Sequence, residues 1–166
     1  MADEVPDETP GHEWGALIKT IAAMVTLAPE YVVVQVHGAD GPHGGPYVQT
    51  LREDEGYMTL EASSNAFLDK PLNNVAIGKL LEMGWSTPEP DSGMPNFFCS
   101  VGPNSTPREI AEFLVRTLRD VYAVSVEAEF ELAPLDLFIE LVNGEFGPST
   151  GMTFVQSTSD PRDIDR

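Results

Sequence analysis

The chain has 166 residues, with 9 Lys and Arg against 27 Asp and Glu, which gives a formal net charge of -18. This length suits one domain with short terminal segments. So large an excess of acid excludes a surface built for nucleic acid or anionic lipid, since both need clustered Lys and Arg. The single cysteine excludes an intramolecular disulfide and a multi-cysteine metal site.

The composition of the two ends predicts one domain over residues 12–142. Residues 1–11 hold acidic residues and prolines without apolar periodicity, which predicts a disordered acidic leader. Residues 143–166 are rich in Gly, Ser, Thr, Asp and Pro and predict a flexible C-terminal tail, in which residues 152–155 suit a short strand. No apolar run approaches the ~18 residues that a membrane span needs. We therefore expect a cytoplasmic protein.

The first half of this domain predicts a helix followed by a three-stranded antiparallel meander. Apolar residues recur with the 3.6-residue period of a helix over residues 12–27. The strands are expected over 31–36, 47–51 and 57–63, the first of them central because it is apolar on both faces. A loop rich in Gly and Pro, 38–46, separates the first two strands.

The second half begins with a short helix. Asn73 or Asn74 caps this helix at its start, and Gly84 is placed to end it in the left-handed conformation. A fourth strand is expected over residues 96–101. This helix and this strand continue the mixture of helices and antiparallel strands that is typical of an α+β fold.

The last three elements are a long helix, a strand and a short helix. The sequence Thr-Pro-Arg-Glu from Thr106 is a capping box with proline at the first helical position. Residues 126–132 alternate Glu with apolar residues and predict an edge strand with its carboxylates in water. Residues 135–142 suit a short last helix.

The sequence offers no arrangement of residues typical of catalysis. The three histidines fall in different elements without metal-ligand spacing, and His43 alone lies in a loop suited to function. Cys99 alternates with Phe98 on a strand and is expected to pack as a small apolar residue. We therefore predict no metal, no cofactor and no enzymatic activity.

Five segments in the same order carry a family resemblance. They are Tyr47-Val48-Gln49, Leu60–Leu68, Leu81–Trp85 with Pro88, Asn96-Phe97 and Thr117–Val124. This series resembles the actinobacterial TY-Chap domain, which is related to the YbjN proteins and the type III secretion chaperones such as CesT. The resemblance covers roughly residues 12–132.

The resemblance implies a type III secretion chaperone-like α-β-β-β-α-β(-β)-α sandwich, an antiparallel sheet with helices on one side. It also implies an acidic, cytoplasmic homodimer that holds an extended segment of a client protein without ATP. We therefore predict a non-enzymatic chaperone-like module that binds a peptide or protein. The candidate binding residues are Tyr47, Gln49, Glu61, Asn65, Phe97, Arg119 and Phe130.

Two other functions remain open. One is a structural or regulatory subunit of a larger assembly, which uses the acidic ends and the 38–46 loop. The other is a small-ligand binder or enzyme, in which Glu61, Asn65, His43 and Arg119 converge on a pocket. An ion pair from Glu61 to Arg116 or Arg119, tying the sheet to a helix, is the simpler interpretation of that carboxylate.

The C-terminal tail is a candidate for self-binding. It carries the apolar residues Met152, Phe154 and Val155 among polar ones. A tail that docks on the domain would imitate a client, so deletion of residues 143–166 is expected to raise the affinity for peptide.

Overall fold

The structure, a computed structural model, describes residues 14–37, 45–143 and 153–155. The leader predicted over 1–11 lies outside these residues, as does most of the tail predicted over 143–166. The elements follow in the order α1, β1, β2, β3, α2, β4, α3, β5, α4 and β6. This is the α+β order expected from the sequence, including the short strand suggested over residues 152–155.

Helix α1 (Gly15–Leu27) buries the predicted apolar stripe, including Leu17, Ile21 and Val25. It ends at Ala28, whose backbone is extended because Pro29 disfavours a helical residue before it. The guanidinium of Arg52 donates hydrogen bonds to the carbonyl oxygens of Val25 (2.6 Å) and Ala28 (3.1 Å). These bonds satisfy carbonyls that the end of the helix leaves without partners.

The six strands form one sheet in the order β4-β3-β2-β1-β5-β6. The strands β1 (Tyr31–Val36), β2 (Tyr47–Arg52) and β3 (Met58–Ala62) form the predicted antiparallel meander. Strand β4 (Phe97–Val101) adds to β3, and β5 (Glu129–Ala133) adds to β1. Strand β1 is therefore central, as predicted.

The sheet differs from the prediction at β5. The alternation over residues 126–132 predicts an edge strand, but β6 (Thr153–Val155) pairs with β5 in parallel orientation. The prediction of an edge was wrong because the alternation within β5 carries no information about its neighbours, so it could not show that the short strand suggested over residues 152–155 pairs there. Strand β4 is the edge at the other end of the sheet.

The caps of the next two helices are those predicted. Asn73 caps α2 (Asn74–Met83), with its side chain accepting from the N–H of Ala76, and Gly84 ends the helix at a φ of 112°. Thr106 and Glu109 form the capping box of α3 (Pro107–Asp120). The last helix is α4 (Leu135–Asn143).

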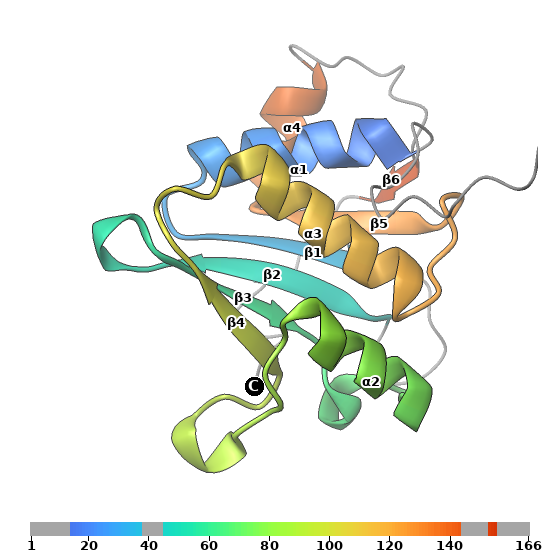
Figure 1. The fold of residues 1–166 in the computed structure, drawn as a ribbon. Helices are drawn as coiled ribbons and strands as arrows, with labels where there is room; N and C mark the ends of the chain where they lie inside the picture. Colours follow the sequence, from blue (N-terminus) through green and yellow to red (C-terminus); the bar gives the residue numbers. More distant parts are fainter. Residues whose placement is uncertain (1–13, 38–44, 144–152, 156–166) are drawn as a thin grey trace, which may run out of the picture.

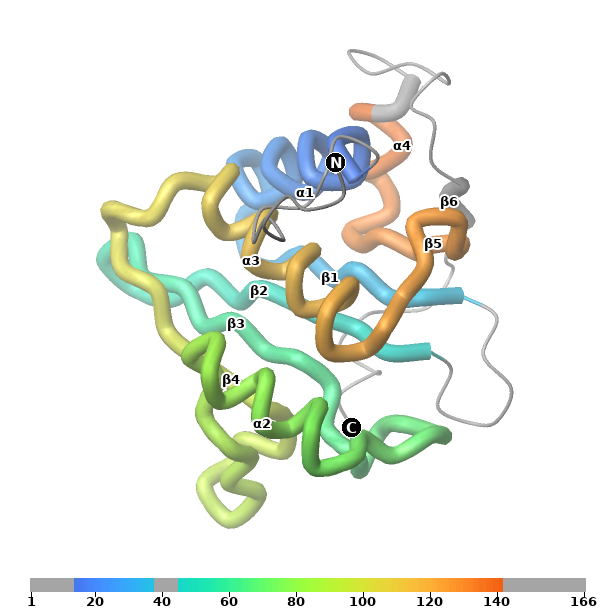
Figure 2. The backbone as a smooth tube through the Cα atoms, turned by 45° about the vertical axis from the view of Figure 1, so that its right-hand side comes forward, coloured from blue at the N-terminus to red at the C-terminus, as the bar shows by residue number. Residues whose placement is uncertain are grey.

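The four helices lie on one face of the twisted sheet (Figures 1 and 2). The main core lies between these two layers, and its fully buried residues include Leu17, Leu60, Leu114, Phe130 and Leu132. A smaller cluster of Val33, Tyr47 and Ala133 occupies the opposite face, which we call the helix-free face. The sandwich with helices on one side is therefore confirmed.

Candidate functional site

Two of the predicted binding residues meet in a buried network on the helix-free face. Its centre is Asn96, which is fully buried. The Nδ2 of Asn96 donates to the hydroxyl of Tyr47 (3.0 Å) and to Oε1 of Glu61 (3.1 Å), while its Oδ1 accepts from the N–H of Ser64 (3.1 Å). One side chain therefore joins β2, β3 and the start of β4.

Three further predicted binding residues are buried as well. The exposed fractions are 2% for Gln49, 4% for Phe97 and 0% for Phe130. Phe97 and Phe130 belong to the main core. Together with Tyr47, they were predicted as a surface for a partner, and the structure places them inside the molecule.

The last two predicted residues lie apart from the others. Asn65 is exposed, and its Oδ1 accepts from the N–H of Leu72 (2.7 Å). Arg119 is half-buried, and its guanidinium pairs with Asp120, with Nε 2.7 Å from Oδ1. This hydrogen bond is the main reason why the pKa of the Asp120 carboxyl lies below its usual value.

The ion pairs found among the described residues include none between Glu61 and a helix arginine. Glu61 bonds to Asn96 on the helix-free face, whereas Arg119 belongs to α3, which covers the other face of the sheet (Figure 1), so the sheet lies between them. His43 lies outside the described residues. The described members of the predicted ligand pocket therefore do not converge.

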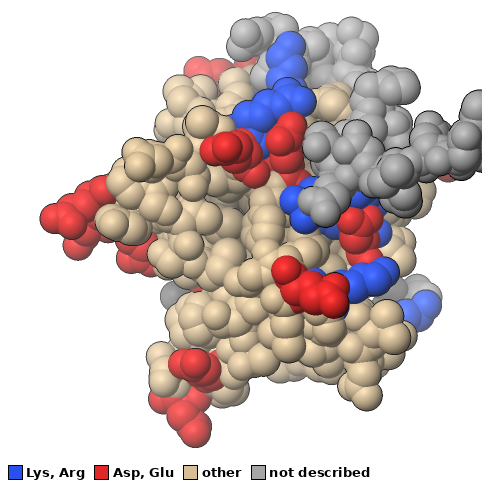
Figure 3. Space-filling view, in the orientation of Figure 1, with Lys and Arg blue, Asp and Glu red and all other residues tan. Residues whose placement is uncertain are grey.

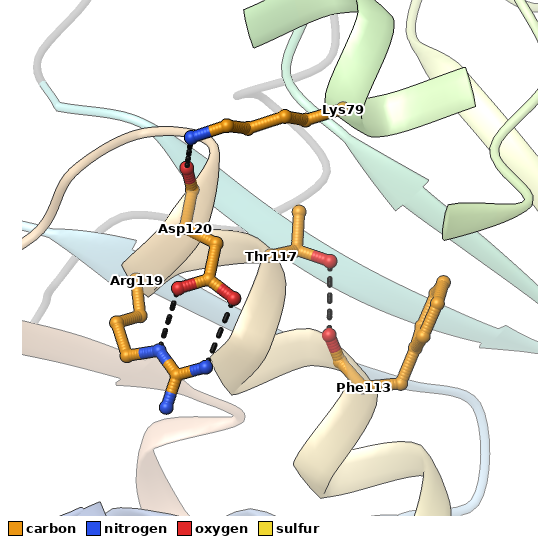
Figure 4. A network of polar contacts seen from close by, with 5 residues as sticks. All are labelled: Lys79, Phe113, Thr117, Arg119 and Asp120. Atoms are coloured by element: carbon orange, nitrogen blue, oxygen red, sulfur yellow. Dashed lines mark hydrogen bonds and ion pairs between the residues drawn. The ribbon is translucent and has the colours of Figure 1, made fainter. Parts of the chain in front are cut away.

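Figure 4 shows Lys79 of α2 reaching the C-terminal end of α3, where Thr117 bonds back to the carbonyl of Phe113 within the helix. The Nζ of Lys79 donates to the carbonyl of Asp120 (3.3 Å) at the end of α3. Trp85 follows α2, and its Nε1 donates to Oγ1 of Thr117 (3.2 Å). The Trp85 ring stacks on Phe113 with centroids 5.2 Å apart. Trp85 and Thr117, which belong to segments of the resemblance, therefore help to hold one helix against the other.

Tyr122 joins the end of α3 to the sheet. Its hydroxyl donates to the carbonyl of Ser63 (2.6 Å), directly after β3. Burial raises the pKa of this phenol. Because a buried hydroxyl needs a partner, the contact fixes where the chain leaves α3.

The structure adds a groove that the sequence did not reveal. It has a volume of about 370 Å³. Apolar residues from β3, β4, α2 and α3 line it, and they are Leu60, Met83, Cys99, Val101, Ile110 and Phe113. The polar residues at its rim are Ser100, Ser105 and Glu109. In Figure 3, the surface between α2 and the start of α3 is mainly uncharged, while acidic side chains lie on the projecting turns and, beside Lys and Arg, over the helices.

Beside the groove, part of the β4 edge lacks a backbone partner. Phe98 faces outward, since its N–H and carbonyl pair with Ser86 (3.2 and 2.7 Å) rather than with β3. Backbone groups alternate in direction along an antiparallel strand, so those of Ser100 also point away from β3. No backbone hydrogen bond among the described residues involves them, and Ser100 is exposed.

A second hollow of about 290 Å³ shares Val101, Ser105 and Ile110 with the groove. It extends the same surface past the end of β4 toward Arg52. The two hollows together follow the outer end of β4. A chain laid along this edge therefore has apolar surface beside it over more than one residue.

Cys99 lines the groove but shows no sign of reactivity. It is partly exposed, and burial raises the pKa of its thiol to about 11. A nucleophilic cysteine needs a lowered pKa, usually from a nearby cation or a helix N-terminus. This thiol therefore contributes apolar surface, as the sequence indicated.

Within the described part of the chain, no three His, Cys, Asp or Glu side chains gather in a way that could hold a metal ion. None of the helices described there has the length and apolar character needed to cross a membrane. The feature that remains is the groove with its free edge. Sequence patterns miss such a site because its walls come from four elements far apart in the chain.

The comparisons with known proteins agree with the resemblance. The sequence model of the family described as T3SS (YopN, CesT) and YbjN peptide-binding chaperone 3 (TY-Chap3) matches residues 7–135. No curated protein matches the chain, and no solved structure does.

Proposed function

We propose, from the premise that this chain belongs to the TY-Chap3 family of peptide-binding chaperones, that it holds an extended segment of a partner protein along the β4 edge. The family is one of peptide-binding chaperones and not of enzymes. The observation that carries the proposal is the outward backbone of Ser100 beside an apolar groove. An added strand gains backbone hydrogen bonds from such an edge, and alternate side chains enter the groove.

The lining of the groove determines which side chains fit. The floor consists of Leu60, Cys99 and Val101, and α3 contributes Ile110 and Phe113. Burial of apolar side chains on these residues favours binding by about 25 cal/mol per Å² of apolar surface removed from water, before the costs of association. The backbone bonds contribute affinity and fix the register, while the side chains that enter the groove set the sequence preference. We therefore propose that the client binds through an extended segment that carries an apolar residue.

The sole cysteine of the chain reports directly on this groove. We would follow modification of Cys99 by iodoacetamide at one mildly alkaline pH, with and without reduced, carboxymethylated α-lactalbumin as an unfolded client. At a client concentration about ten times Kd, the rate should fall about 10-fold. An unchanged rate under conditions in which the client binds would place the client elsewhere.

A pair of variants tests the edge itself. Ser100→Pro removes the outward N–H, and proline is tolerated on an edge strand where this group faces solvent. Ser100→Thr keeps the N–H and is the matched control. We expect the proline variant to lose protection of Cys99 and the threonine variant to keep it. Equal protection in both variants would show that the client does not pair with β4.

Three finer features remain proposals. We propose that the chain is of actinobacterial origin and that it forms a homodimer in the cytoplasm, as the resemblance implies. Sedimentation equilibrium at micromolar concentrations tests the dimer, and a monomer would contradict it. The alternative of a fixed subunit predicts one stoichiometric partner whose binding is indifferent to Ser100→Pro.

A further inference from the structure

The other end of the sheet already carries an added strand. Strand β6 pairs with β5 in parallel through Glu129↔Thr153, Phe130↔Phe154 and Glu131↔Val155. The remaining strands are all paired in antiparallel orientation. The chain therefore demonstrates that the β5 edge accepts an extended segment.

At this edge, the backbone N–H and carbonyl of Phe130 are the groups that can pair with an added strand. The N–H of His37 donates to the carbonyl of Glu129 (2.7 Å), so the backbone of Glu129 faces β1. By alternation the N–H and carbonyl of Phe130 face β6. In a parallel pair these groups bond to the residues on either side of the one opposite, here Thr153 and Val155.

Strand β6 is a weak occupant of this edge. It has three residues, and parallel pairs are less stable per residue than antiparallel ones. Its sequence also offers no positive charge opposite the two glutamates of β5. The positions beside Glu129 and Glu131 hold Thr153 and Val155, neither of which is a cation.

The charges of β5 define a better occupant. Glu129 is exposed and makes no ion pair with another described residue, while Glu131 is partly exposed and pairs with His37. Both lie on the helix-free face, since Phe130 between them points into the core. A strand with Lys or Arg opposite each glutamate and an apolar residue opposite Phe130 matches all three positions.

We propose that the β5 edge is a second binding surface, that β6 occupies it in the resting protein, and that an extended partner segment with a basic-apolar-basic pattern displaces β6. This inference rests on the proposed function only in that both ligands are extended segments. It concerns the opposite edge of the sheet and a different sequence preference.

The test uses the full chain with Val155→Pro. This substitution removes the N–H that faces the carbonyl of Phe130. Phe154→Pro is the matched control, because the N–H of residue 154 points away from β5. We expect amide hydrogen exchange at Phe130, followed by NMR, to become fast in Val155→Pro and to stay slow in the control. Slow exchange in both variants would overturn the proposal.

Synthetic peptides then test the partner's chemistry. The probes are GMTFVQS, which is residues 151–157, GMKFKQS, GMEFEQS, and GMKFKQS methylated on the backbone nitrogen of its fifth residue. GMKFKQS should restore slow exchange at Phe130 in Val155→Pro and bind about 2- to 30-fold tighter than GMTFVQS, from two cross-strand charge pairs. GMEFEQS and the methylated peptide should bind more weakly than GMTFVQS.

The outcomes separate the two proposals. Equal binding of the lysine and glutamate peptides, or binding that ignores the methyl group, would contradict the inference for β5. If GMKFKQS protects Cys99 and leaves Phe130 unchanged, the peptide uses the β4 groove, and only the proposal for β5 fails. If the unfolded client does not protect Cys99 while amide exchange at Phe130 changes as expected, only the proposed function is overturned.

Discussion

Asn96 supports three parts of the sheet through one side chain. Replacement with alanine removes its bonds to Tyr47, Glu61 and Ser64 and leaves the buried Glu61 with one donor fewer. We expect Asn96→Ala to lower the free energy of unfolding by about 2–3 kcal/mol. Chemical denaturation measures this change. The control is Asn65→Ala, which removes one exposed hydrogen bond and should cost less than about 1 kcal/mol.

His37 provides a pH-dependent contact at the same scale. The hydrogen bond to Glu131 raises the pKa of His37 above 6.5, with smaller contributions from the charges of Glu131 and Glu129. A raised folded pKa gives stability that is complete below the unfolded pKa and is lost as pH rises through the folded pKa. NMR titration should show the raised value, and Glu131→Gln should bring it back toward 6.5.

The stability of this variant should follow the same pH window. At pH values below the unfolded pKa of His37, the wild type should have a higher melting temperature than Glu131→Gln. The two melting temperatures should converge at pH values above the folded pKa of His37. A difference that persists at high pH would mean that Glu131 stabilises the fold by other contacts.

The elements themselves are held in place by side chains between them. Thr117 of α3 accepts from the indole N–H of Trp85 and donates to the carbonyl of Phe113. Thr117→Val keeps the shape and leaves the buried indole N–H without its acceptor, so we expect a loss of about 1–2 kcal/mol. Thr26→Val is the control, since Thr26 makes the same bond within α1 to Ala22 and is exposed.

Calorimetry of the two variants decides this point. Equal melting temperatures for Thr117→Val and Thr26→Val would mean that the Trp85 contact contributes little. A lower melting temperature for Thr117→Val alone would show that it fixes α2 against α3.

The sequence predicted the ends of α2 and α3 well because the residues that cap a helix bond to backbone groups close by in the chain. The Asn73 cap, the left-handed Gly84 and the capping box at Thr106 all satisfy backbone groups within a few residues of themselves. The same reasoning failed for β5, whose second neighbour is β6 from a distant segment. Residues 126–128, predicted as strand, form a turn before β5 begins at Glu129.

At the scale of the whole molecule, the net charge of -18 opposes compaction. Few cations are present to offset it, and the ion pairs among described residues lie at the surface, where each contributes about 0–1 kcal/mol. Salt screens repulsion between exposed charges beyond about 10 Å at 0.1 M. We therefore expect the melting temperature to rise between low salt and about 0.5 M NaCl.

A series in sodium chloride with far-UV circular dichroism measures this effect. Repetition near pH 4.2, where the sequence has its isoelectric point, is the control and should show a smaller rise. A melting temperature that falls with salt at neutral pH would mean that attractive ion pairs outweigh the repulsion.

The sequence alone determined the α+β order, the helix caps, the central β1 and the family resemblance, because each follows from periodicity, local hydrogen bonding or motifs read along the chain. The tertiary structure alone decided that Tyr47, Gln49, Phe97 and Phe130 are buried, that Glu61 bonds to Asn96, and that Arg119 pairs with Asp120. It also decided where the groove lies and that β6 covers β5. The physical reason is that burial and edge pairing depend on which distant segments meet, and no local pattern in the chain specifies that.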